Sequence, residues 1–318
     1  MHKGDSVRVL VTGANGFVGR HLVRLLSKQE EIELFAGVHH RDVWADEIEQ
    51  KFGVNVIPFD LGNKDSIREL VKSAQPDQTY HLAGISKTFG VSTEDYFQIN
   101  SLGTYHLGEF LLKELGVHSR LLFISSAGVY GSKGQQILTE TDPVKPSSEY
   151  GASKASAEAF LWSLHAKGLD VVIARPFNHT GAGQARGFVC SDLVYRLKAS
   201  IANTRVDEIP HLEVGKLHSV RDFTDVRDVV TAYQMIMGNF ESGSIVNVSS
   251  GHGVSVKEIV DMLVHDIACL SDVHLMTLQD QLSRVDDDII IGNSSLLRQM
   301  GWEPKFSMMD SLRELWEI

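Results

Sequence analysis

Short apolar runs alternate with amphipathic segments along the first half of the chain. The runs 6–11, 33–38, 54–60, 80–84, 120–124 and 170–175 have the composition and length of buried strands. Between them, 64–73 and 100–115 carry apolar residues at helical spacing. This alternation predicts βαβ units and therefore a doubly wound parallel α/β sheet.

The first run passes directly into a glycine-rich turn, Thr12-Gly13-Ala14-Asn15-Gly16-Phe17-Val18-Gly19, and then into an amphipathic segment. Glycines in a strand-to-helix turn let the backbone approach a pyrophosphate, and the following helix N-terminus offers free N–H groups. The pattern predicts a Rossmann-type fold that binds a dinucleotide. The expected cofactor contacts in this turn are Gly13, Asn15, Gly16, Phe17, Val18 and Gly19.

The end of the second predicted strand bears on the choice between NAD and NADP. NAD-binding chains place an acidic residue about 20 positions after the glycines. His39 stands there and Arg41 follows, whereas Asp42 lies further into the loop. Basic groups suit a 2′-phosphate, so we expect NADPH to be preferred, with NAD possible. The alternative is that His39 and Arg41 are solvated loop residues without a ligand.

Later strand ends add further cofactor candidates. Asp60 and Leu61 can bracket an adenine edge, and Leu82-Ala83-Gly84 is small enough to run along the cofactor. Asn100 begins the helical segment 100–115, where the competing role is a helix cap or a hydrogen bond in the core. His81 is expected to be structural.

A tyrosine and a lysine lie one helical turn apart in Glu149-Tyr150-Gly151-Ala152-Ser153-Lys154. A lysine ammonium beside a phenol favours the phenolate, which brings the tyrosine into the range useful for proton transfer. Tyr-x3-Lys also occurs by chance on exposed helices. Ser126 follows the predicted strand 120–124, where it can hydrogen-bond the oxygen that Tyr150 protonates, although serines after strands commonly form turns.

Composition narrows the class of protein. With 318 residues, 43% of them hydrophobic, the chain can bury a large core, and a net charge of −11 argues against nucleic acid or an anionic membrane as partner. The sequence has neither the apolar run of a signal peptide nor that of a membrane span, so a cytoplasmic protein is expected. Cys190 and Cys269 are expected to be reduced thiols in the core. The histidines are scattered, so no metal is implied.

Three blocks carry a resemblance to a known family. Thr-Gly-x-x-Gly-Phe-x-Gly, Ser-Ser-x-x-Val-Tyr-Gly and Tyr-x3-Lys occur in this order, which resembles the extended short-chain dehydrogenases/reductases that act on nucleotide sugars. The resemblance implies that Ser126, Tyr150 and Lys154 form a catalytic triad. Tyr150 would be the acid/base, Lys154 would lower its pKa and hold the nicotinamide ribose, and Ser126 would orient the substrate carbonyl. It also implies cofactor contacts from Pro176.

Two later blocks are similar to those of the GDP-4-keto-6-deoxy-mannose reductases. These are Arg175-Pro176-Phe177-Asn178-His179 and the segment 220–228, Val-Arg-Asp-Phe-Thr-Asp-Val-Arg-Asp. Ala182 replaces a proline usual in that family. The resemblance implies a GDP-sugar substrate, with Arg221 and Arg284 on the diphosphate. Arg221 could instead join an ion-pair network with its acidic neighbours. The implied substrate contacts are Ser86, Ser126, Asn178, Val189, Arg221 and Arg284.

The resulting hypothesis is reduction of the C4 ketone of GDP-4-keto-6-deoxy-mannose to GDP-rhamnose, or to its 6-deoxy-talose epimer. An NAD-dependent sugar epimerase and a non-catalytic dinucleotide-sensing protein are the alternatives. We expect a Rossmann domain over 1–176 and a smaller C-terminal α/β substrate lobe over 177–318, with some segments returning to the first domain. As in relatives, the helices 100–115 and 150–167 are expected to pair in a homodimer.

Overall fold

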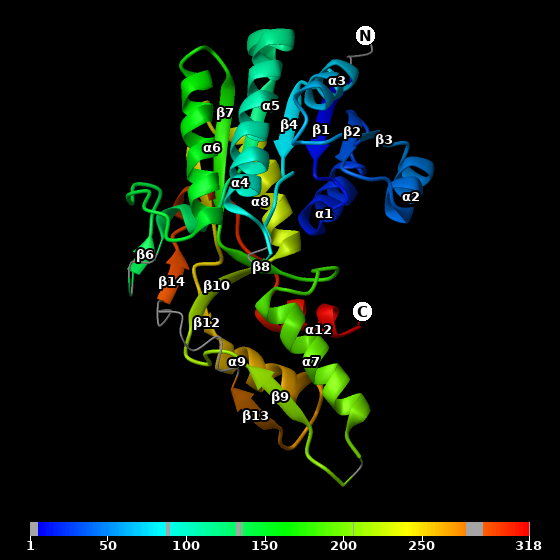
Figure 1. Cartoon of the computed structure of the whole chain (residues 1–318), viewed down its shortest axis with the longest axis vertical. Helices are drawn as coiled ribbons and strands as arrows, with labels where there is room; N and C mark the ends of the chain where they lie inside the picture. The colour runs from blue at the N-terminus through cyan, green and yellow to red at the C-terminus, as the bar shows by residue number, and fades with distance from the viewer. Residues whose placement is uncertain are drawn as a thin grey trace.

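The computed structural model describes residues 6–86, 90–131, 134, 136–205, 207–277 and 289–317. Figure 1 shows two parts, a sheet flanked by helices at the top and a smaller lobe below it. In the described part of the chain, no helix is long and apolar enough to cross a membrane.

The larger part is built on a parallel seven-stranded sheet. Its strand order is β11-β7-β5-β4-β1-β2-β3, and every neighbouring pair is parallel. The order reverses beside β1, so the crevice for a ligand lies beyond the carboxyl end of this strand. The strands are β1 (Val7–Thr12), β2 (Ile32–Val38), β3 (Asn55–Pro58), β4 (Gln78–His81), β5 (Arg120–Ile124), β7 (Asp170–Pro176) and β11 (Ile245–Val248).

The predicted Rossmann-type sheet is therefore confirmed, and two details differ from the sequence-based expectation. Strand β4 ends at His81, so 82–84 is a loop beyond the sheet rather than strand. Strand β11, which pairs with β7 at the sheet edge, was not expected.

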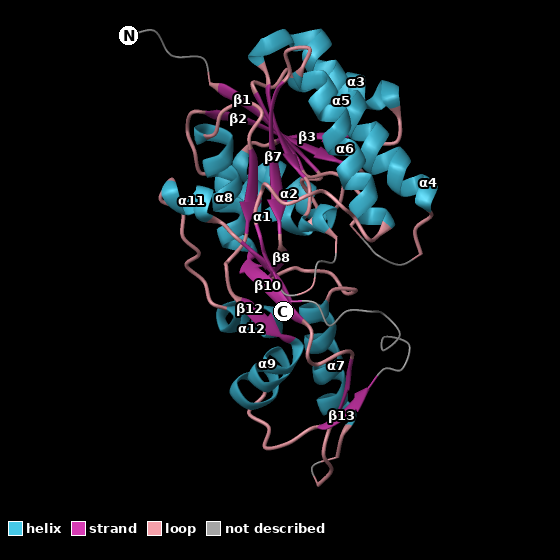
Figure 2. Cartoon of the chain, turned by 90° about the vertical axis from the view of Figure 1, so that its left-hand side faces the viewer, coloured by secondary structure: helices cyan, strands magenta, loops and turns pink. Residues whose placement is uncertain are grey.

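Helices cover both faces of this sheet (Figure 2). Because side chains alternate along a strand, Val9 and Val11 of β1 point to one face and Leu10 to the other. The first face is covered by α1 (Phe17–Leu26), α2 (Val43–Phe52), α8 (Val226–Asn239) and α11 (Ser295–Gln299), and the second by α3 (Lys64–Ala74), α5 (Thr104–Phe110) and α6 (Glu149–His165).

The helix expected to begin at Asn100 begins earlier. Ser92 caps α4 (Thr93–Tyr96) by accepting a hydrogen bond from the backbone N–H of Asp95, and the helical run then continues without a break. Asn100 consequently lies inside the run, and its role as a cap was wrong. The run continues through the π-helical η1 (Phe97–Gly103), then α5, then η2 (Leu111–Leu115), and ends in the 3-10 turn η3 (Gly116–His118).

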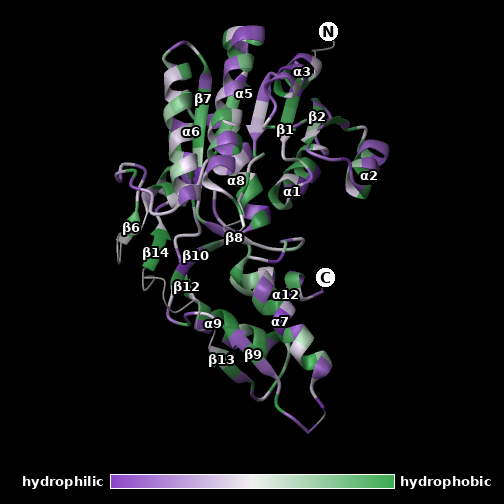
Figure 3. Cartoon of the chain, viewed as in Figure 1, coloured by the Kyte–Doolittle hydropathy of each residue, from purple (hydrophilic) through white to green (hydrophobic). Residues whose placement is uncertain are grey.

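The smaller lobe has its own apolar core, formed by helices on one side of short strands. Strand β10 (Val220–Asp225) is central, pairing with β8 (Asn178–Thr180), β12 (Gly253–Ser255) and β14 (Ile289–Gly292); β6 (Gln136–Leu138) extends the sheet beyond β14. Figure 3 colours β1 and β14 as hydrophobic. The other elements are α7 (Val189–Asn203), β9 (His211–Val214), α9 (Val256–Asp261), η5 (Met262–Ile267), β13 (His274–Thr277) and α12 (Met308–Glu317).

The two cysteines lie in different environments. Cys190 is buried in the core of the smaller lobe, but Cys269 is exposed. The expectation of two core thiols was therefore wrong for Cys269. This residue follows η5 in a left-handed conformation with φ of 53°, which turns the chain out of the helix and its side chain away from the core.

Candidate active site

The glycine turn between β1 and α1 leaves no room for side chains. A Cβ on Gly13, whose φ is +68°, would lie 2.8 Å from the backbone nitrogen of Ala83, and a Cβ on Gly19 would lie 2.2 Å from the carbonyl oxygen of Gly13. Gly16 precedes α1 without a side-chain cap. The helix N-terminus can therefore direct its backbone N–H groups at an anion, as a dinucleotide pyrophosphate requires.

The basic segment after β2 is partly engaged by acidic side chains. Arg41 forms ion pairs with Asp46 at 2.9 Å and with Glu49 at 2.5 Å, both on α2. The rings of His39 and His40 lie 3.9 Å apart. Arg41 is exposed at the predicted position, but a 2′-phosphate has to compete with two carboxylates for it.

Asp42 has a structural role at the start of α2. Its carboxylate accepts from the backbone N–H of Ala45 at the start of α2 and pairs with Arg20 at 2.6 Å.

After β3, Asp60 is exposed and Leu61 is not. Asp60 accepts a hydrogen bond from the backbone N–H of Gly62 at 2.8 Å. The Leu61 side chain is buried in the core, because the leucine packs where α3 and α5 meet the sheet.

The loop after β4 connects the glycine turn to the catalytic helix. Ala83 lies against Gly13, and a Cβ on Gly84 would be 2.8 Å from Asn100 Oδ1 and 3.6 Å from Lys154 Nζ. Leu82 is partly buried in the core. The structure therefore brings together residues of four predicted cofactor segments.

Asn100 is buried and forms three hydrogen bonds within the protein. Its Oδ1 accepts from the backbone N–H of Ile85 at 2.7 Å, while its Nδ2 donates to the carbonyl of Ile85 at 3.0 Å and to Ser153 Oγ at 3.1 Å. These bonds support the core interpretation. They hold the loop after β4 against α6 and use both N–H donors of the Asn100 side chain, so its contact with a cofactor stays a prediction that only Oδ1 could serve.

The three candidate catalytic residues meet at the carboxyl end of β5. Ser148 caps α6, which places Tyr150 in the first turn and Lys154 in the second. Tyr150 forms a hydrogen bond with Ser126. The close approach requires glycine, because a Cβ on Gly151 would lie 2.4 Å from the carbonyl oxygen of Gly128. Gly128 belongs to the 3-10 turn η4 (Ala127–Tyr130).

The pKa of Tyr150 is shifted in the direction opposite to the one expected. Burial raises it, and the hydrogen bond with Ser126 only partly opposes this effect. Lys154 does not act on the phenol here as expected, because its Nζ donates to the carbonyl of Ile124 at 2.8 Å. A raised pKa keeps the phenol protonated, which is the state that can donate a proton.

Two of the predicted substrate residues begin elements of the smaller lobe. Asn178 begins β8 and Val189 begins α7, both exposed, and Pro176 before them is buried at the end of β7. Ser86 is exposed after β4, and Arg284 lies outside the described residues.

Arg221 lies half-buried in β10, and a structural network surrounds it. Asp222 accepts from backbone N–H groups of 250, 251 and 292. Arg227 is the centre of the ion pairs, with Asp225 at 2.8 Å and with Glu314. The structure therefore has an ion-pair network centred on Arg227. Arg221 itself donates from Nη1 to the carbonyl of Val220 at 2.9 Å, and its place in this network or on a diphosphate stays a prediction.

Sequence reasoning missed Tyr96, which packs against the catalytic tyrosine. The rings of Tyr96 and Tyr150 are 6.3 Å apart in an edge-on arrangement. They border a pocket of about 210 Å³ together with Val91, Thr93, Ser148 and Glu149. The Ser92-x-x-Asp95 cap, which begins the helix ahead of Tyr96, is the signal that could have placed it. Among the described residues, no cluster of three or more His, Cys, Asp or Glu could hold a metal.

Comparison with known proteins agrees with this geometry. Residues 10–315 match the GDP-mannose 4,6 dehydratase family. The chain belongs to this family. It is 32% identical to GDP-6-deoxy-D-mannose reductase of Pseudomonas aeruginosa, over 98% of this chain and 97% of that protein. It is 28% identical to GDP-6-deoxy-D-talose 4-dehydrogenase of Aggregatibacter actinomycetemcomitans, over 97% and 96%.

Among solved structures, the chain resembles RMD from Pseudomonas aeruginosa complexed with NADPH. The TM-score is 0.80 at 29% identity, covering 98% of both chains. The UDP-glucose 4-epimerase of Thermus thermophilus in complex with NAD gives a TM-score of 0.81 at 25% identity, again over 98% of both. The chain is thus an extended short-chain dehydrogenase/reductase, an enzyme of a family that binds nicotinamide dinucleotides.

Proposed function

We propose that the chain reduces the C4 ketone of GDP-4-keto-6-deoxy-D-mannose, giving GDP-D-rhamnose or its 6-deoxy-talose epimer. The observation that carries this proposal is similarity over nearly the whole chain to a GDP-6-deoxy-D-mannose reductase, at 32% identity. The hydrogen-bonded pair of Ser126 and Tyr150 at the sheet edge supports it.

The residues of the site have different roles in such a reduction. NADPH, once bound, would supply the hydride for the C4 carbon. Ser126 holds the ketone oxygen, and Tyr150 donates its phenolic proton to that oxygen as negative charge develops. Lys154, buried and directed at the end of β5, provides positive charge next to the site. The glycine turn and the N-terminus of α1 hold the cofactor pyrophosphate.

The deciding experiment supplies GDP-4-keto-6-deoxy-mannose and NADPH to the purified protein. The expected result is NADPH oxidation in proportion to product, with the C4 configuration read by NMR. A nucleotide-sugar 4-epimerase is the second candidate function, because the chain shares its fold with a UDP-glucose 4-epimerase. Interconversion of C4 epimers without net cofactor consumption would support the epimerase. A protein that binds the cofactor but turns over neither kind of sugar would support a sensing role.

NADPH preference is part of the proposal, since His39 and Arg41 stand where an acidic ribose ligand would be. Arg41→Ala should lower kcat/KM for NADPH and leave that for NADH nearly unchanged. Arg24→Ala, on the exposed side of α1, is the matched control. Equal kcat/KM values for the two cofactors in the unmodified protein would refute the preference.

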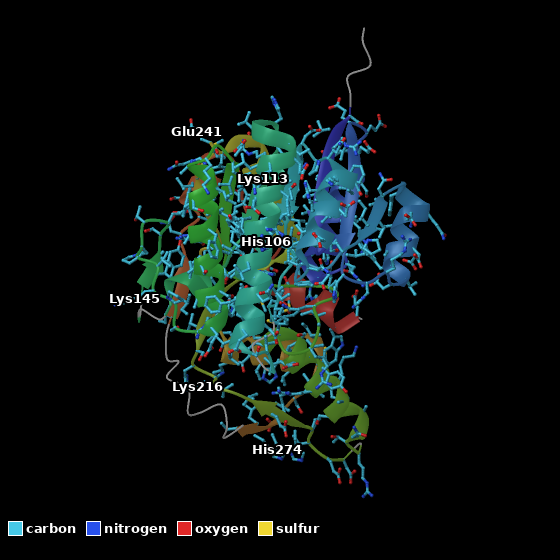
Figure 4. The ribbon with its side chains drawn as sticks, turned by 45° about the horizontal axis from the view of Figure 1, so that its top comes forward. His106, Lys113, Lys145, Lys216, Glu241 and His274 are labelled. Atoms are coloured by element: carbon cyan, nitrogen blue, oxygen red, sulfur yellow. The ribbon has the colours of Figure 1, made fainter. Side chains whose placement is uncertain are left out.

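We also propose a cytoplasmic homodimer in which the helical segments 100–115 and 150–167 pair across a two-fold axis. The ring centres of Tyr105 and Phe160, one from each segment, lie 5.3 Å apart. Leu102, in the first segment, is 38% exposed. Figure 4 shows His106 and Lys113 along this segment. A monomeric mass by light scattering would rule the dimer out.

A further inference from the structure

A buried ion pair lies beneath the catalytic helix. Glu158 of α6 accepts two hydrogen bonds from Arg175 of β7, at 3.0 and 2.6 Å, and both side chains are less than 5% exposed. Ser125 Oγ donates to the same carboxylate at 2.5 Å. Glu158 therefore ties the end of β5, one residue before Ser126, to its neighbour β7.

The guanidinium of Arg175 also contacts an aromatic side chain. Arg175 lies 4.8 Å from the centre of the Tyr130 ring. Tyr130 donates its hydroxyl hydrogen to Asn247 Oδ1 at 2.7 Å, and Asn247 Nδ2 donates to the carbonyl of Leu138. The pair is thus built into a network that spans β5, β7 and β11, with little freedom to move.

Glu158 also faces the catalytic lysine. It follows Lys154 by four residues, so both lie on the same face of α6. Burial lowers the pKa of Lys154 to about 8, and the negative charge of Glu158 opposes this effect. The other ionisable groups near the ammonium are Tyr150 in the preceding turn and His81 of β4, which burial keeps neutral.

We propose that Glu158 is a positioning residue that keeps Lys154 protonated at neutral pH and fixes Ser125 next to the catalytic Ser126. Arg175 serves to hold the carboxylate ionised and oriented in a buried site. Without it, Glu158 would be a buried charge with only Ser125 as partner. The effect on turnover rests on the proposed reductase function, whereas the effect on the lysine charge does not.

The charge of Lys154 can be measured without substrate. Protein labelled with ¹³Cε-lysine is titrated by NMR, and the Lys154 signal is assigned from its loss in Lys154→Arg. In the unmodified protein it should titrate near pH 8. Glu158→Gln, which keeps the shape but removes the charge, should lower this midpoint by about one pH unit or more. Ser125→Ala, which removes a hydrogen bond but no charge, should leave it unchanged.

Glu158→Gln leaves Arg175 buried without its counter-charge and can fail to fold. The double variant Glu158→Gln with Arg175→Gln removes both charges and should still titrate below the unmodified protein. An unchanged midpoint in whichever variant folds would overturn the proposal and leave Glu158 a purely structural role. An equal shift of the Lys154 midpoint in Ser125→Ala would also overturn the proposal.

Turnover gives the second readout. The basic limb of the pH profile for NADPH oxidation should move to lower pH in Glu158→Gln and stay in place in Ser125→Ala. An unmoved limb in a variant whose lysine midpoint has shifted would overturn the catalytic part of the proposal. If the unmodified protein reduces no GDP-keto sugar, the proposed function fails, while the lysine titration still decides the role of Glu158.

Discussion

Lowering the pH from 7 to 5 should destabilise the fold through one buried histidine. His81 accepts at Nδ1 from Thr12 Oγ1 and donates from Nε2 to Thr104 Oγ1, at 2.7 and 2.9 Å. Its partners fix this arrangement, because the Thr104 hydroxyl already donates to the carbonyl of Asn100, while the Thr12 hydroxyl already accepts from the N–H of Ala83. The site is therefore satisfied by the neutral ring, and a second ring proton would meet a hydroxyl hydrogen.

The magnitude follows from the pKa of His81. Burial, with a smaller contribution from the charge of Lys154, lowers it from 6.5 to about 3. The unfolded chain then binds a proton that the folded chain does not, so stability is full above pH 6.5 and falls as the pH drops toward 3. The full loss is roughly 3–6 kcal/mol, of which about 2 kcal/mol is lost between pH 7 and pH 5.

The assay is urea unfolding of the cofactor-free protein at pH 7 and pH 5. His81→Gln can keep one donor and one acceptor but does not titrate, so its free energy of unfolding should fall less than that of the unmodified protein, by about 2 kcal/mol. His118→Gln, at an exposed position, is the control and should follow the unmodified protein. If His81→Gln loses as much stability as the unmodified protein, the buried neutral ring is not the cause.

Three further results are expected. Tyr150→Phe should keep the fold and cofactor binding but lose about 10²- to 10⁴-fold in kcat, and near-normal turnover would refute its role as the acid. In the native protein a thiol reagent should modify exposed Cys269 and spare Cys190, which is buried with its pKa raised to about 12; two thiols titrated before unfolding would contradict this. Gly19→Ala should weaken dinucleotide binding at least tenfold by calorimetry, since its Cβ would lie 2.2 Å from the Gly13 carbonyl oxygen; unchanged affinity would refute the tight turn.

The features that the sequence predicted correctly are those that depend on a local pattern of residues. Strand β5 has the bounds expected, since 120–124 is a short apolar run, and α6 has Tyr150 and Lys154 on adjacent turns as helical spacing requires. The start of the helix at Asn100 was wrong because only polar residues, 93–95, follow the cap at Ser92 before the first apolar positions of the helical run.

What the sequence could not supply were contacts between distant segments. The sequence places Glu158 in a helix and Arg175 in a strand. No spacing rule predicts that the two side chains meet in the core. The pKa of Tyr150 was misjudged for the same reason. The Tyr-x3-Lys pattern gives the separation along the helix, but the lysine's partner, the carbonyl of Ile124, comes from another strand.

The catalytic turn also sets what the enzyme should be unable to do, although its family is named for a dehydratase. Dehydration across C5 and C6 of a hexose needs an additional base and acid, whereas the turn after Ser126 carries Ala127 and Gly128, neither of which can exchange a proton. A Cβ on Gly128 would lie 3.3 Å from Ser126 Oγ and 3.8 Å from Tyr150 Cδ1, so a side chain there would reach the site. We therefore expect GDP-mannose with NADP⁺ to give no 4-keto-6-deoxy product, measured by NMR. Dehydration of GDP-mannose by the unmodified protein would overturn the reductase proposal, and an acid from another segment would have to serve the reaction.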